Sequence, residues 1–322
     1  MPKKVLILAG GGGHTGYAEI IADRLHNKVD LIFITPENEA INRKRLEKYG
    51  HVEEIIKPRH PKTNIILFPF RLFWAFCQSI IKIQPNIDLI ISTGSNFCIA
   101  PSIIGYLKGI PIVNLESRVK LLQPSKTAKI LQKFSSITIL QWPEQSKFLK
   151  GIVVGPLLPN KKIQPYDGGY ILASGGTYGY EELFDALVET DIHNIILQTG
   201  KINPEKYREI KPDWKIFDFS VYFLELIAGA SIVISPPGTT PVESVTYGKY
   251  TIIVRYPDWT KAADIEETRM FAQKINAFLL EDVSKEGIQN ALAKVKQMEK
   301  KQLVDGTTNL VNLLIEKFRL EE

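Results

Sequence analysis

Short apolar runs alternate with helical patterns along most of the chain. In the first half, the runs that we interpret as strands are residues 3–9, 29–35, 87–92, 112–115, 137–141 and 151–154. Helical patterns follow the first run and cover about residues 38–48 and 98–108. Continuous apolar strands separated by helices are typical of a parallel sheet covered on both faces, so the pattern predicts an α/β, doubly wound domain.

The alternation stops at Val154-Gly-Pro-Leu-Leu-Pro159, and the polar residues that follow up to Gly169 are typical of an interdomain linker. It resumes with predicted strands at residues 170–173, 194–198, 231–235, 250–254 and 277–280. Predicted helices cover about residues 179–190, 221–229, 240–248, 262–274, 284–299 and 303–319. The expected organisation is a domain at 1–155, a linker at 156–168, a second doubly wound domain at 169–302 and a helical segment at 303–322. We expect the two domains to face each other across a cleft, with ligands beyond the carboxyl ends of the strands.

The composition fits a globular protein of two domains: 322 residues, 44% hydrophobic and 23% charged. The two cysteines, Cys77 and Cys98, form no disulfide framework or metal-ligand cluster, so we expect a reducing compartment. Because a strand is predicted to begin at residue 3, we expect no signal peptide. No apolar run reaches the roughly 18 residues of a membrane span.

Charge is distributed unevenly along the chain. Residues 1–155 hold 21 basic and 11 acidic side chains, whereas the remaining residues hold 19 and 24. A basic half joined to a slightly acidic half indicates that the first half meets an anionic partner. A well-solvated surface is the alternative interpretation.

The first strand ends in a glycine-rich turn, Gly10 to Thr15, which contains Gly11, Gly12, Gly13 and His14. Glycines between a strand and a helix leave backbone N–H groups bare at a helix N-terminus, which suits a phosphate. His14 adds a group that can move a proton near neutral pH; the alternative is a capping or loop histidine. The spacing also fits a dinucleotide-binding fingerprint, but no hydride-transfer site accompanies it.

Two further strand ends carry polar residues. Thr93, Gly94, Ser95 and Asn96 follow one strand and could bind a ligand, or Ser95 or Asn96 could simply cap the next helix. The segment at 111–120 ends a strand with Glu116 and Arg118. Glu116 could orient a histidine or accept a proton, and Arg118 could neutralise a phosphate; a structural Glu–Arg pair is the alternative.

The motifs Gly-Gly-Gly-His-Thr at 11–15, Leu-Glu-Ser-Arg-Val at 115–119 and Gln141-Trp-Pro-Glu144 resemble the membrane-recruiting subunit of the two-subunit UDP-GlcNAc transferase of the dolichol pathway. The second half resembles the catalytic subunit of that enzyme, through Ser174-Gly-Gly-Thr177 and the segment Val233 to Glu243. Both halves are also similar to the bacterial transferase that adds GlcNAc to the lipid-linked peptidoglycan precursor. The resemblance covers nearly the whole chain and implies a GT-B fold, with the C-terminal helix crossing back onto the first domain.

The resemblance implies a UDP-sugar site in the second half. Glu243 would hold the ribose hydroxyls of UDP, because a carboxylate accepts hydrogen bonds from two hydroxyls. The other residues of this expected site are Ser174, Gly175, Gly176, Thr177, Gln198, Gly238, Thr239, Thr240 and Asp264. This sequence departs from the family pattern at two places that concern contacts with the donor sugar. The spacing from Gly238 to Glu243 is one residue shorter than usual, and Asp264 and Glu266 stand where the family has a His-Gln pair. A solvated helix start is the alternative for Asp264.

The resemblance implies an inverting glycosyltransferase that moves GlcNAc from UDP-GlcNAc to a polyprenyl-diphosphate-linked GlcNAc and forms a β-1,4 linkage. His14 or Glu116 would be the catalytic base. The acceptor and its phosphates would contact Gly11, Gly12, Gly13, Thr15, Thr93, Gly94, Ser95, Asn96 and Arg118. Helix N-termini would stabilise the leaving diphosphate, so neither a cofactor nor a metal is required, and no Asp-x-Asp signature is present.

Residues 65–81 hold five aromatic side chains, and their basic flanks are Lys57, Arg59, His60, Lys62, Arg71 and Lys82. The stretch is too short to span a bilayer but could lie in the headgroup plane; a buried helix is the alternative. Because the expected acceptor is a polyprenyl lipid, we expect peripheral docking on the cytoplasmic face of the cell membrane, without the usual N-terminal anchor.

The expected partners are therefore UDP-GlcNAc, a lipid-linked sugar and the membrane surface, with no nucleic acid and with homo-oligomerisation left open. Three other functions remain. They are a UDP-GlcNAc 2-epimerase, a non-catalytic nucleotide-sugar-binding protein and an NAD-dependent enzyme.

Overall fold

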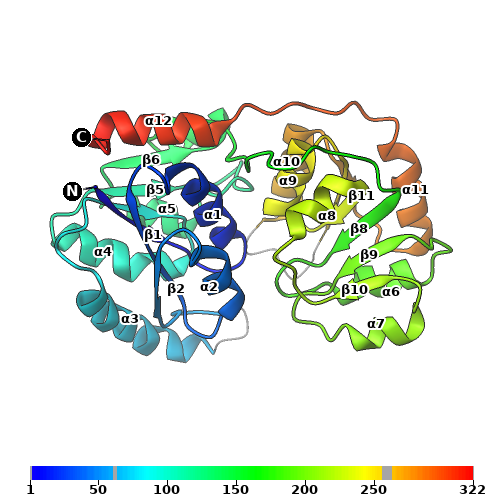
Figure 1. The fold of residues 1–322 in the computed structure, drawn as a ribbon, viewed down its shortest axis with the longest axis horizontal. Coiled ribbons are helices and arrows are strands. Elements are labelled where there is room, and N and C mark those ends of the chain that lie inside the picture. The colour runs from blue at the N-terminus through cyan, green and yellow to red at the C-terminus, as the bar shows by residue number, and fades with distance from the viewer. Residues whose placement is uncertain (1, 61–63, 256–262, 322) are drawn as a thin grey trace. The chain divides into compact units, whose positions relative to one another are not determined.

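The computed structural model describes residues 2–60, 64–255 and 263–321, and the chain forms two compact units (Figure 1). Unit 1 runs to Leu157 and resumes at Asp305, whereas unit 2 spans Leu158–Val304. Residues 158–168, which the sequence predicted as linker, belong to unit 2. Tyr166 N donates to Ala228 O (3.0 Å) and Gly168 N to Gly229 O (2.8 Å), so this segment is hydrogen-bonded to the unit that it enters.

Unit 1 is built on a seven-stranded sheet in the order β3-β2-β1-β4-β5-β6-β7, with every pair parallel. Its strands are β1 (Lys4–Leu8), β2 (Asp30–Pro36), β3 (His51–Ile55), β4 (Leu89–Ser92), β5 (Ile112–Leu115), β6 (Ile137–Leu140) and β7 (Ile152–Val153). Its α-helices are α1 (Gly13–Leu25), α2 (Ala40–Leu46), α3 (Phe68–Lys82), α4 (Ile99–Leu107), α5 (Lys126–Leu131) and α12 (Gly306–Phe318). The described part of this unit also contains the 3₁₀ segments η1 (Ile65–Leu67), η2 (Asn96–Cys98) and η3 (Pro143–Lys147).

The two faces of this sheet are covered by different helices, as the continuous apolar strands require. Along β1, Val5 and Ile7 join the cluster that contains α1 and α12, whereas Leu6 and Leu8 join the cluster of α4 on the other face. Because β1 is buried on both faces, it lacks the polar alternation of a half-exposed strand. The predicted doubly wound parallel sheet is therefore confirmed for this unit.

The C-terminal helix α12 packs against α1. Leu310 and Leu314 lie in the same buried cluster as Ile20 and Ile21, and Figure 1 shows the red helix beside unit 1. Asp305 caps the helix, because its side chain accepts hydrogen bonds from the first-turn N–H groups. The chain therefore leaves unit 1 once and returns to it.

Unit 2 is a second parallel sheet, in the order β10-β9-β8-β11-β12-β13. Its strands are β8 (Tyr170–Ser174), β9 (Ile195–Gln198), β10 (Lys215–Phe217), β11 (Ala230–Ser235), β12 (Tyr250–Val254) and β13 (Phe278–Leu280). Its helices are α6 (Glu181–Val188), α7 (Glu205–Ile210), α8 (Phe223–Gly229), α9 (Thr239–Thr246), α10 (Ile265–Ile275) and α11 (Lys285–Val295). Apolar clusters cover both faces, one including α6 and α11 and the other including α8. The strand order reverses between β1 and β4 in unit 1 and between β8 and β11 in unit 2, which is where open α/β sheets bind ligands.

The pattern missed the shortest or most polar elements. Strand β3 has the polar sequence His-Val-Glu-Glu-Ile, so no apolar run marks it. This sequence is tolerated because β3 lies at the edge of the sheet and is partly exposed. Strand β10 has three residues, and α5 and α7 have six each. Helix α11 ends at Val295, four residues before the predicted end. The predicted start of the helix at residue 262 lies outside the described residues.

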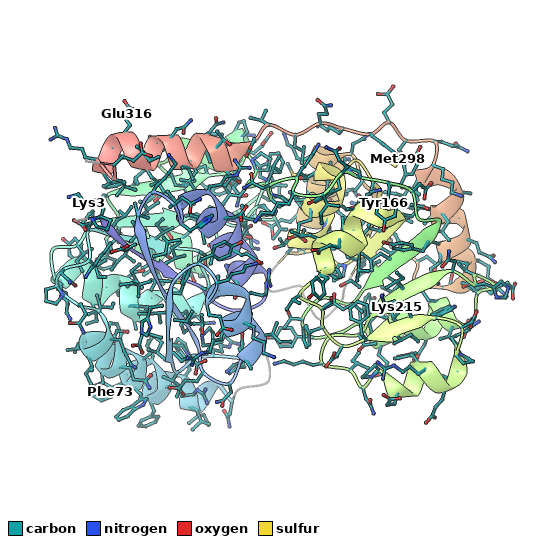
Figure 2. All side chains as sticks on the ribbon, in the orientation of Figure 1. Lys3, Phe73, Tyr166, Lys215, Met298 and Glu316 are labelled. Atoms are coloured by element: carbon teal, nitrogen blue, oxygen red, sulfur yellow. The ribbon has the colours of Figure 1, made fainter. Side chains whose placement is uncertain are left out.

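Helix α3 has an apolar face that unit 1 does not cover. Phe70 is 72% exposed and Phe73 is 68% exposed, whereas Ala75 and Ser79 are buried against the unit. Figure 2 shows Phe73 on the outer side of the helix. The buried-helix alternative is thus wrong for the aromatic side of α3. Across the described residues, none of the helices combines the length and apolar character needed to cross a bilayer. Among the basic residues that flank residues 65–81, Lys62 lies outside the described residues.

Candidate functional site

The loops after β1 and β4 are in contact at the switch point of unit 1. A Cβ at Gly10 would lie 2.2 Å from Ser95 Oγ and 3.0 Å from Gly94 O, so only glycine fits there. Gly11 and Gly12 have φ angles of 86° and 56°, which favour glycine. Gly12 is the N-cap of α1 and supplies no capping side chain. Two segments that the sequence singled out separately, residues 10–15 and 92–96, therefore form one site.

His14 is the second residue of α1 and lies against the β4 loop. Its Nδ1 is 2.6 Å from Thr93 O, and a Cβ at Gly94 would lie 3.1 Å from its Cε1. Burial lowers the pKa of His14 to about 4, helped by the charges of Lys57 and Arg118 and opposed by the Thr93 hydrogen bond. The imidazole is therefore neutral at neutral pH, and Nδ1–H donates to the Thr93 carbonyl. Nε2 is then the unprotonated nitrogen and can accept a proton, but the lowered pKa makes it a weaker base than a free imidazole.

An ion pair lies beside the same glycine turn. Lys57 Nζ is 3.6 Å from Glu39 Oε1, and a Cβ at Gly11 would lie 2.8 Å from Lys57 Nζ and 2.6 Å from Glu39 Oε2. Sequence reasoning placed Lys57 only among the basic flanks of residues 65–81. No local motif marks it or Glu39 as a site residue, because both reach the turn through the strand order β3-β2-β1.

Glu116 is fully buried and faces the backbone. Its Oε1 accepts from Ser117 N (2.6 Å) and its Oε2 from Ser125 N (2.8 Å), the N-cap residue of α5. Burial raises the pKa of Glu116 to about 7, although these N–H groups act in the opposite direction. The prediction that Glu116 orients His14 is wrong, because the imidazole bonds to Thr93 O instead. No Glu116–Arg118 ion pair occurs among the described residues, so the structural-pair alternative is wrong too.

Arg118 is packed on Tyr17 of α1. Its backbone N and its Nε both donate to the Tyr17 hydroxyl (3.0 and 2.9 Å), and its Cζ lies 4.4 Å from the centre of the ring. The side chain is buried, and neither Nη1 nor Nη2 has a hydrogen-bond partner in the part of the chain that the structure describes. A charged group with two unpartnered nitrogens among the described residues is thus placed beside the helix that carries His14.

The Gln141-Trp-Pro-Glu144 motif holds the 115–120 loop in place. Trp142 Nε1 donates to Arg118 O (2.7 Å), and Gln141 Nε2 donates to Glu116 O (2.9 Å). Gln145, which sequence reasoning missed, donates through Nε2 to the carbonyls of Ser117 and Lys120, both at 2.8 Å. The segments 115–119 and 141–144, which the sequence analysis singled out separately, therefore form one hydrogen-bonded unit.

The remaining predicted residues of the β4 loop stabilise its backbone. Ser95, at φ 70°, caps η2 and accepts from Phe97 N at 3.3 Å, which confirms the capping alternative. Thr93 Oγ1 donates to Leu8 O (2.7 Å), and Asn96 Nδ2 donates to Arg59 O (3.4 Å). These contacts fix the carbonyl that orients His14.

In unit 2, the loops after β8 and β9 are tightly joined. Ser174 Oγ donates to Gln198 Oε1 (2.8 Å) and accepts from Gly176 N (3.1 Å). A Cβ at Gly200 would lie 2.3 Å from Gly176 O. Gly175 N donates to Gln198 O, and Thr177 O accepts from Lys201 N, both at 3.1 Å.

The switch point of unit 2 also carries a helix opened by glycine. Gly238, at φ 151°, is the N-cap of α9, which has no side-chain cap and no acidic residue in its first turn. Thr239 and Thr240 begin the helix, and Glu243 is buried within it. Asp264 does not join this group through its side chain: it is the N-cap of α10 and accepts from Glu267 N (2.8 Å), so the helix-start alternative is confirmed.

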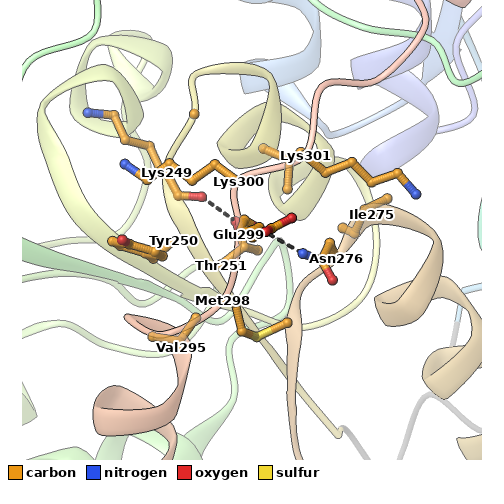
Figure 3. A pocket seen from close by; sticks show the side chains of 12 residues that line it. Lys249, Tyr250, Thr251, Ile275, Asn276, Val295, Met298, Glu299, Lys300 and Lys301 are labelled. Carbon is orange, nitrogen blue, oxygen red and sulfur yellow. Dashed lines mark hydrogen bonds between the residues drawn. The ribbon is translucent and has the colours of Figure 1, made fainter.

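A small pocket in unit 2 lies away from these strand ends (Figure 3). Lys249, Tyr250, Asn276 and Lys300 are among its lining residues, and Asn276 Nδ2 donates to Glu299 O across it (2.7 Å). Its volume of about 10 Å³ holds no more than one water molecule, and it lies at the start of β12. It is therefore not the substrate site.

Comparison with known proteins identifies the second half of the chain. Residues 178–315 match the glycosyltransferase family 28 C-terminal domain. This match makes the protein a glycosyltransferase.

Two curated relatives extend over more of the chain. The UDP-N-acetylglucosamine transferase subunit alg14 of Schizosaccharomyces pombe is 25% identical over 173 residues, which cover 48% of this chain and 82% of that protein. The UDP-N-acetylglucosamine–N-acetylmuramyl-(pentapeptide) pyrophosphoryl-undecaprenol N-acetylglucosamine transferase of Prochlorococcus marinus is 26% identical over 290 residues, which cover 81% of this chain and 80% of that protein.

Solved structures share the fold of the whole chain. Acinetobacter baumannii MurG has a TM-score of 0.62 at 17% identity and covers 98% of this chain and 100% of its own. The S. aureus MnaA–UDP complex has a TM-score of 0.71 at 11% identity, with 99% and 98% coverage. With two Rossmann-like units, this glycosyltransferase has the GT-B fold.

Proposed function

We propose that this glycosyltransferase moves GlcNAc from UDP-GlcNAc to a sugar on a polyprenyl diphosphate, with inversion at the anomeric carbon. We further propose that the product is the β-1,4-linked disaccharide of N-glycan precursor assembly. The observation that carries the proposal is the glycine-opened helix N-terminus at the switch point of each unit, one of which bears a neutral histidine. Both curated relatives are named as N-acetylglucosamine transferases, which supports this donor.

In the proposed donor site, the diphosphate of UDP lies at the N-terminus of α9. The backbone dipole at Gly238 and Thr239 stabilises the negative charge that develops as UDP leaves. Glu243 accepts hydrogen bonds from the ribose hydroxyls, and the Ser174–Thr177 turn contacts the nucleotide from the β8 side. A Cβ at Gly176 would lie 3.6 Å from Pro236, so the two turns lie together.

In the proposed reaction, the acceptor hydroxyl attacks the anomeric carbon and the bond to the β-phosphate oxygen of UDP breaks. UDP leaves with the bonding electron pair, and the hydroxyl proton passes to His14 Nε2. Since Glu116 is enclosed by the backbone, His14 is the better base. General-base catalysis contributes about 10²–10⁴-fold, so we expect His14→Gln to lower turnover by about that factor.

The exposed face of α3 is the proposed contact with the lipid bilayer. Phe70, Phe73 and Trp74 of α3 and Ile66 of the preceding η1 are each more than half exposed. Lys108, the C-cap residue of α4, donates to Ile80 O and places a cationic group at the C-terminal end of α3, where Lys82 pairs with Glu53. Aromatic side chains next to basic ones are typical of a surface that docks on anionic lipid. We propose peripheral attachment on the cytoplasmic face.

The test uses purified protein, labelled UDP-GlcNAc and a short polyprenyl-diphosphate-GlcNAc. We expect a lipid-linked disaccharide. Failure with every UDP-sugar offered would reject transfer to this acceptor. Conversion of free UDP-GlcNAc without acceptor would instead indicate a 2-epimerase, and tight UDP binding without any turnover would indicate a binding protein.

A further inference from the structure

Glu116 is a buried carboxylate that the proposed reaction leaves unused. It directly follows β5, its exposed fraction is 0%, and the acceptor proton passes to His14 instead. Burying a charged carboxylate is unfavourable unless hydrogen-bond donors compensate for the lost water. The donors around Glu116 therefore indicate which part of the structure it stabilises.

The two carboxylate oxygens bond to opposite ends of one loop. Oε1 accepts from Ser117 N (2.6 Å), where the chain leaves β5, and Oε2 accepts from Ser125 N (2.8 Å), where the chain enters α5. Ser125 is also the N-cap of α5, because its hydroxyl accepts from Ala128 N (3.1 Å). Residues 117–125, the Glu116 loop, are therefore closed at both ends by one side chain.

The Glu116 loop has contacts with α1 and with the segment at η3. On the α1 side, Arg118 donates to the Tyr17 hydroxyl through its backbone N and its Nε. On the η3 side, Trp142 and Gln145 donate to backbone carbonyls in the first half of the loop. The second half is joined to the end of β5 by the bond that Glu116 accepts from Ser125 N. This carboxylate therefore fixes the distance between the two ends of the loop.

Only an ionised Glu116 can bond to both ends of the loop. An ionised carboxylate accepts hydrogen bonds on both oxygens. A neutral carboxyl has one carbonyl acceptor and an O–H group that is itself a donor. In the neutral form, one of the two backbone N–H groups therefore loses its acceptor.

Burial places this change of charge near neutral pH. It raises the pKa of Glu116 to about 7, although the N–H groups of Ser117 and Ser125 and the charge of Lys120 act in the opposite direction. Other titratable side chains in the loop and on the elements that border it are Arg118, His14 and Tyr17 of α1, Lys126 and Lys129 of α5, and Glu144 and Lys147 of η3. The three lysines on α5 and η3 are exposed, and His14 is neutral at this pH.

We propose that Glu116 is a positioning residue that ties both ends of the Glu116 loop together while it is ionised and releases one end when it takes up a proton. Above about pH 7 the closed loop holds Arg118 against Tyr17, and below that pH the loop opens at one end. The inference rests on the proposed function only where it concerns the acceptor. Because the loop carries Arg118, an expected acceptor contact, its opening weakens acceptor binding but leaves the base His14 in place.

The first measurement follows the loop without any substrate. In the wild-type protein, the amide protons of Ser117 and Ser125 and the labelled carboxyl carbon of Glu116 are recorded by NMR from pH 5.5 to 8.5. We expect all three resonances to shift together, with a midpoint at about pH 7. Thr308 N, which donates to Asp305, is the internal control. Against the effect of burial, Thr308 holds the pKa of Asp305 below its usual value, so this amide should not titrate in the same range. A Glu116 carboxyl that does not titrate, or that titrates without the two amides, would overturn the proposal.

The second measurement separates positioning from catalysis. Glu116→Gln presents one carbonyl oxygen at every pH, so it can hold only one end of the loop. With a short polyprenyl-diphosphate-GlcNAc, we expect the acceptor KM of the variant to equal that of the wild type at pH 6. At pH 8.5 it should be about tenfold higher than in the wild type, because a hydrogen bond to a charged group contributes roughly that factor. The kcat of the variant should stay close to that of the wild type.

A general base would give the opposite result. Loss of a base lowers kcat about 10²–10⁴-fold and leaves the acceptor KM unchanged, and this outcome in Glu116→Gln would overturn the proposal. A wild-type acceptor KM that does not change between pH 6 and 8.5 would overturn it too. Glu205→Gln, which removes an exposed carboxylate of α7 in unit 2, is the matched control and should follow the wild type in both constants.

Failure of the proposed function would look different. The NMR titration needs neither an acceptor nor a variant, so it decides on the loop even where Glu116→Gln does not fold. If Glu116 and the two amides titrate together but no lipid-linked disaccharide forms, the closure of the loop stands and the proposed transfer is rejected.

Discussion

Replacing His14 by glutamine should make the stability of unit 1 less sensitive to acid. In the folded protein burial holds the pKa of His14 at about 4, against 6.5 for a free imidazole. In the unfolded chain the ring takes up a proton as the pH falls below 6.5, whereas the folded protein resists it. Because the folded pKa is depressed, the stability that His14 contributes is fully present above pH 6.5 and is lost as the pH falls through 4.

The size of the effect follows from that difference. Each pKa unit corresponds to about 1.4 kcal/mol, so the complete loss is about 3 kcal/mol, of which about 2 kcal/mol has gone by pH 5. Glutamine does not titrate, so His14→Gln lacks this loss. Between pH 7.5 and 5 the free energy of unfolding should therefore fall by about 2 kcal/mol more in wild type than in the variant.

Urea denaturation at a series of pH values measures the difference. All other titrating groups are common to both proteins and cancel in the comparison. His193→Gln, which replaces an imidazole that is 89% exposed, controls for the loss of a histidine and should follow the wild type. Parallel curves for wild type and His14→Gln would show that the folded protein does not hold His14 neutral, and would remove the basis for assigning Nε2 as the base.

Three other predictions concern separate features. Serine at the three exposed aromatic positions of α3, Phe70, Phe73 and Trp74, should reduce sedimentation with anionic liposomes without lowering the unfolding midpoint; undiminished sedimentation would reject α3 as the docking face. Gly10→Ala should lower the free energy of unfolding by about 1–3 kcal/mol in urea denaturation, because its Cβ would lie 2.2 Å from Ser95 Oγ. An unchanged free energy would mean that the loops after β1 and β4 can move apart at little cost. Gln145→Ala should cost about 3 kcal/mol, because the Lys120 carbonyl loses its donor and the buried N–H groups of Gln141 and Trp142 lose their acceptor. A loss below 1 kcal/mol would contradict the bracing role.

The sequence predicted the sheets better than the contacts of the site. Continuous apolar strands and glycine-rich turns depend on local sequence, so the two doubly wound sheets and the turns at Gly10 and Gly238 could be predicted. Lys57 could not be placed beside Gly11, because that contact depends on the order in which β1, β2 and β3 pair. The carboxylate of Glu116 was expected to meet His14, but nearby backbone N–H groups provide partners that a residue pattern does not reveal.

The return of α12 to unit 1 has a consequence for synthesis of the protein. The first 157 residues leave the ribosome without the helix that covers Ile20 and Ile21 on α1. That apolar surface stays open while all of unit 2 is translated, and it closes only when residues 306–318 emerge. Unit 2, in contrast, is contiguous in sequence and can complete its folding first. A nascent chain stalled before α12 should therefore expose unit 1, rather than unit 2, to chaperones and proteases.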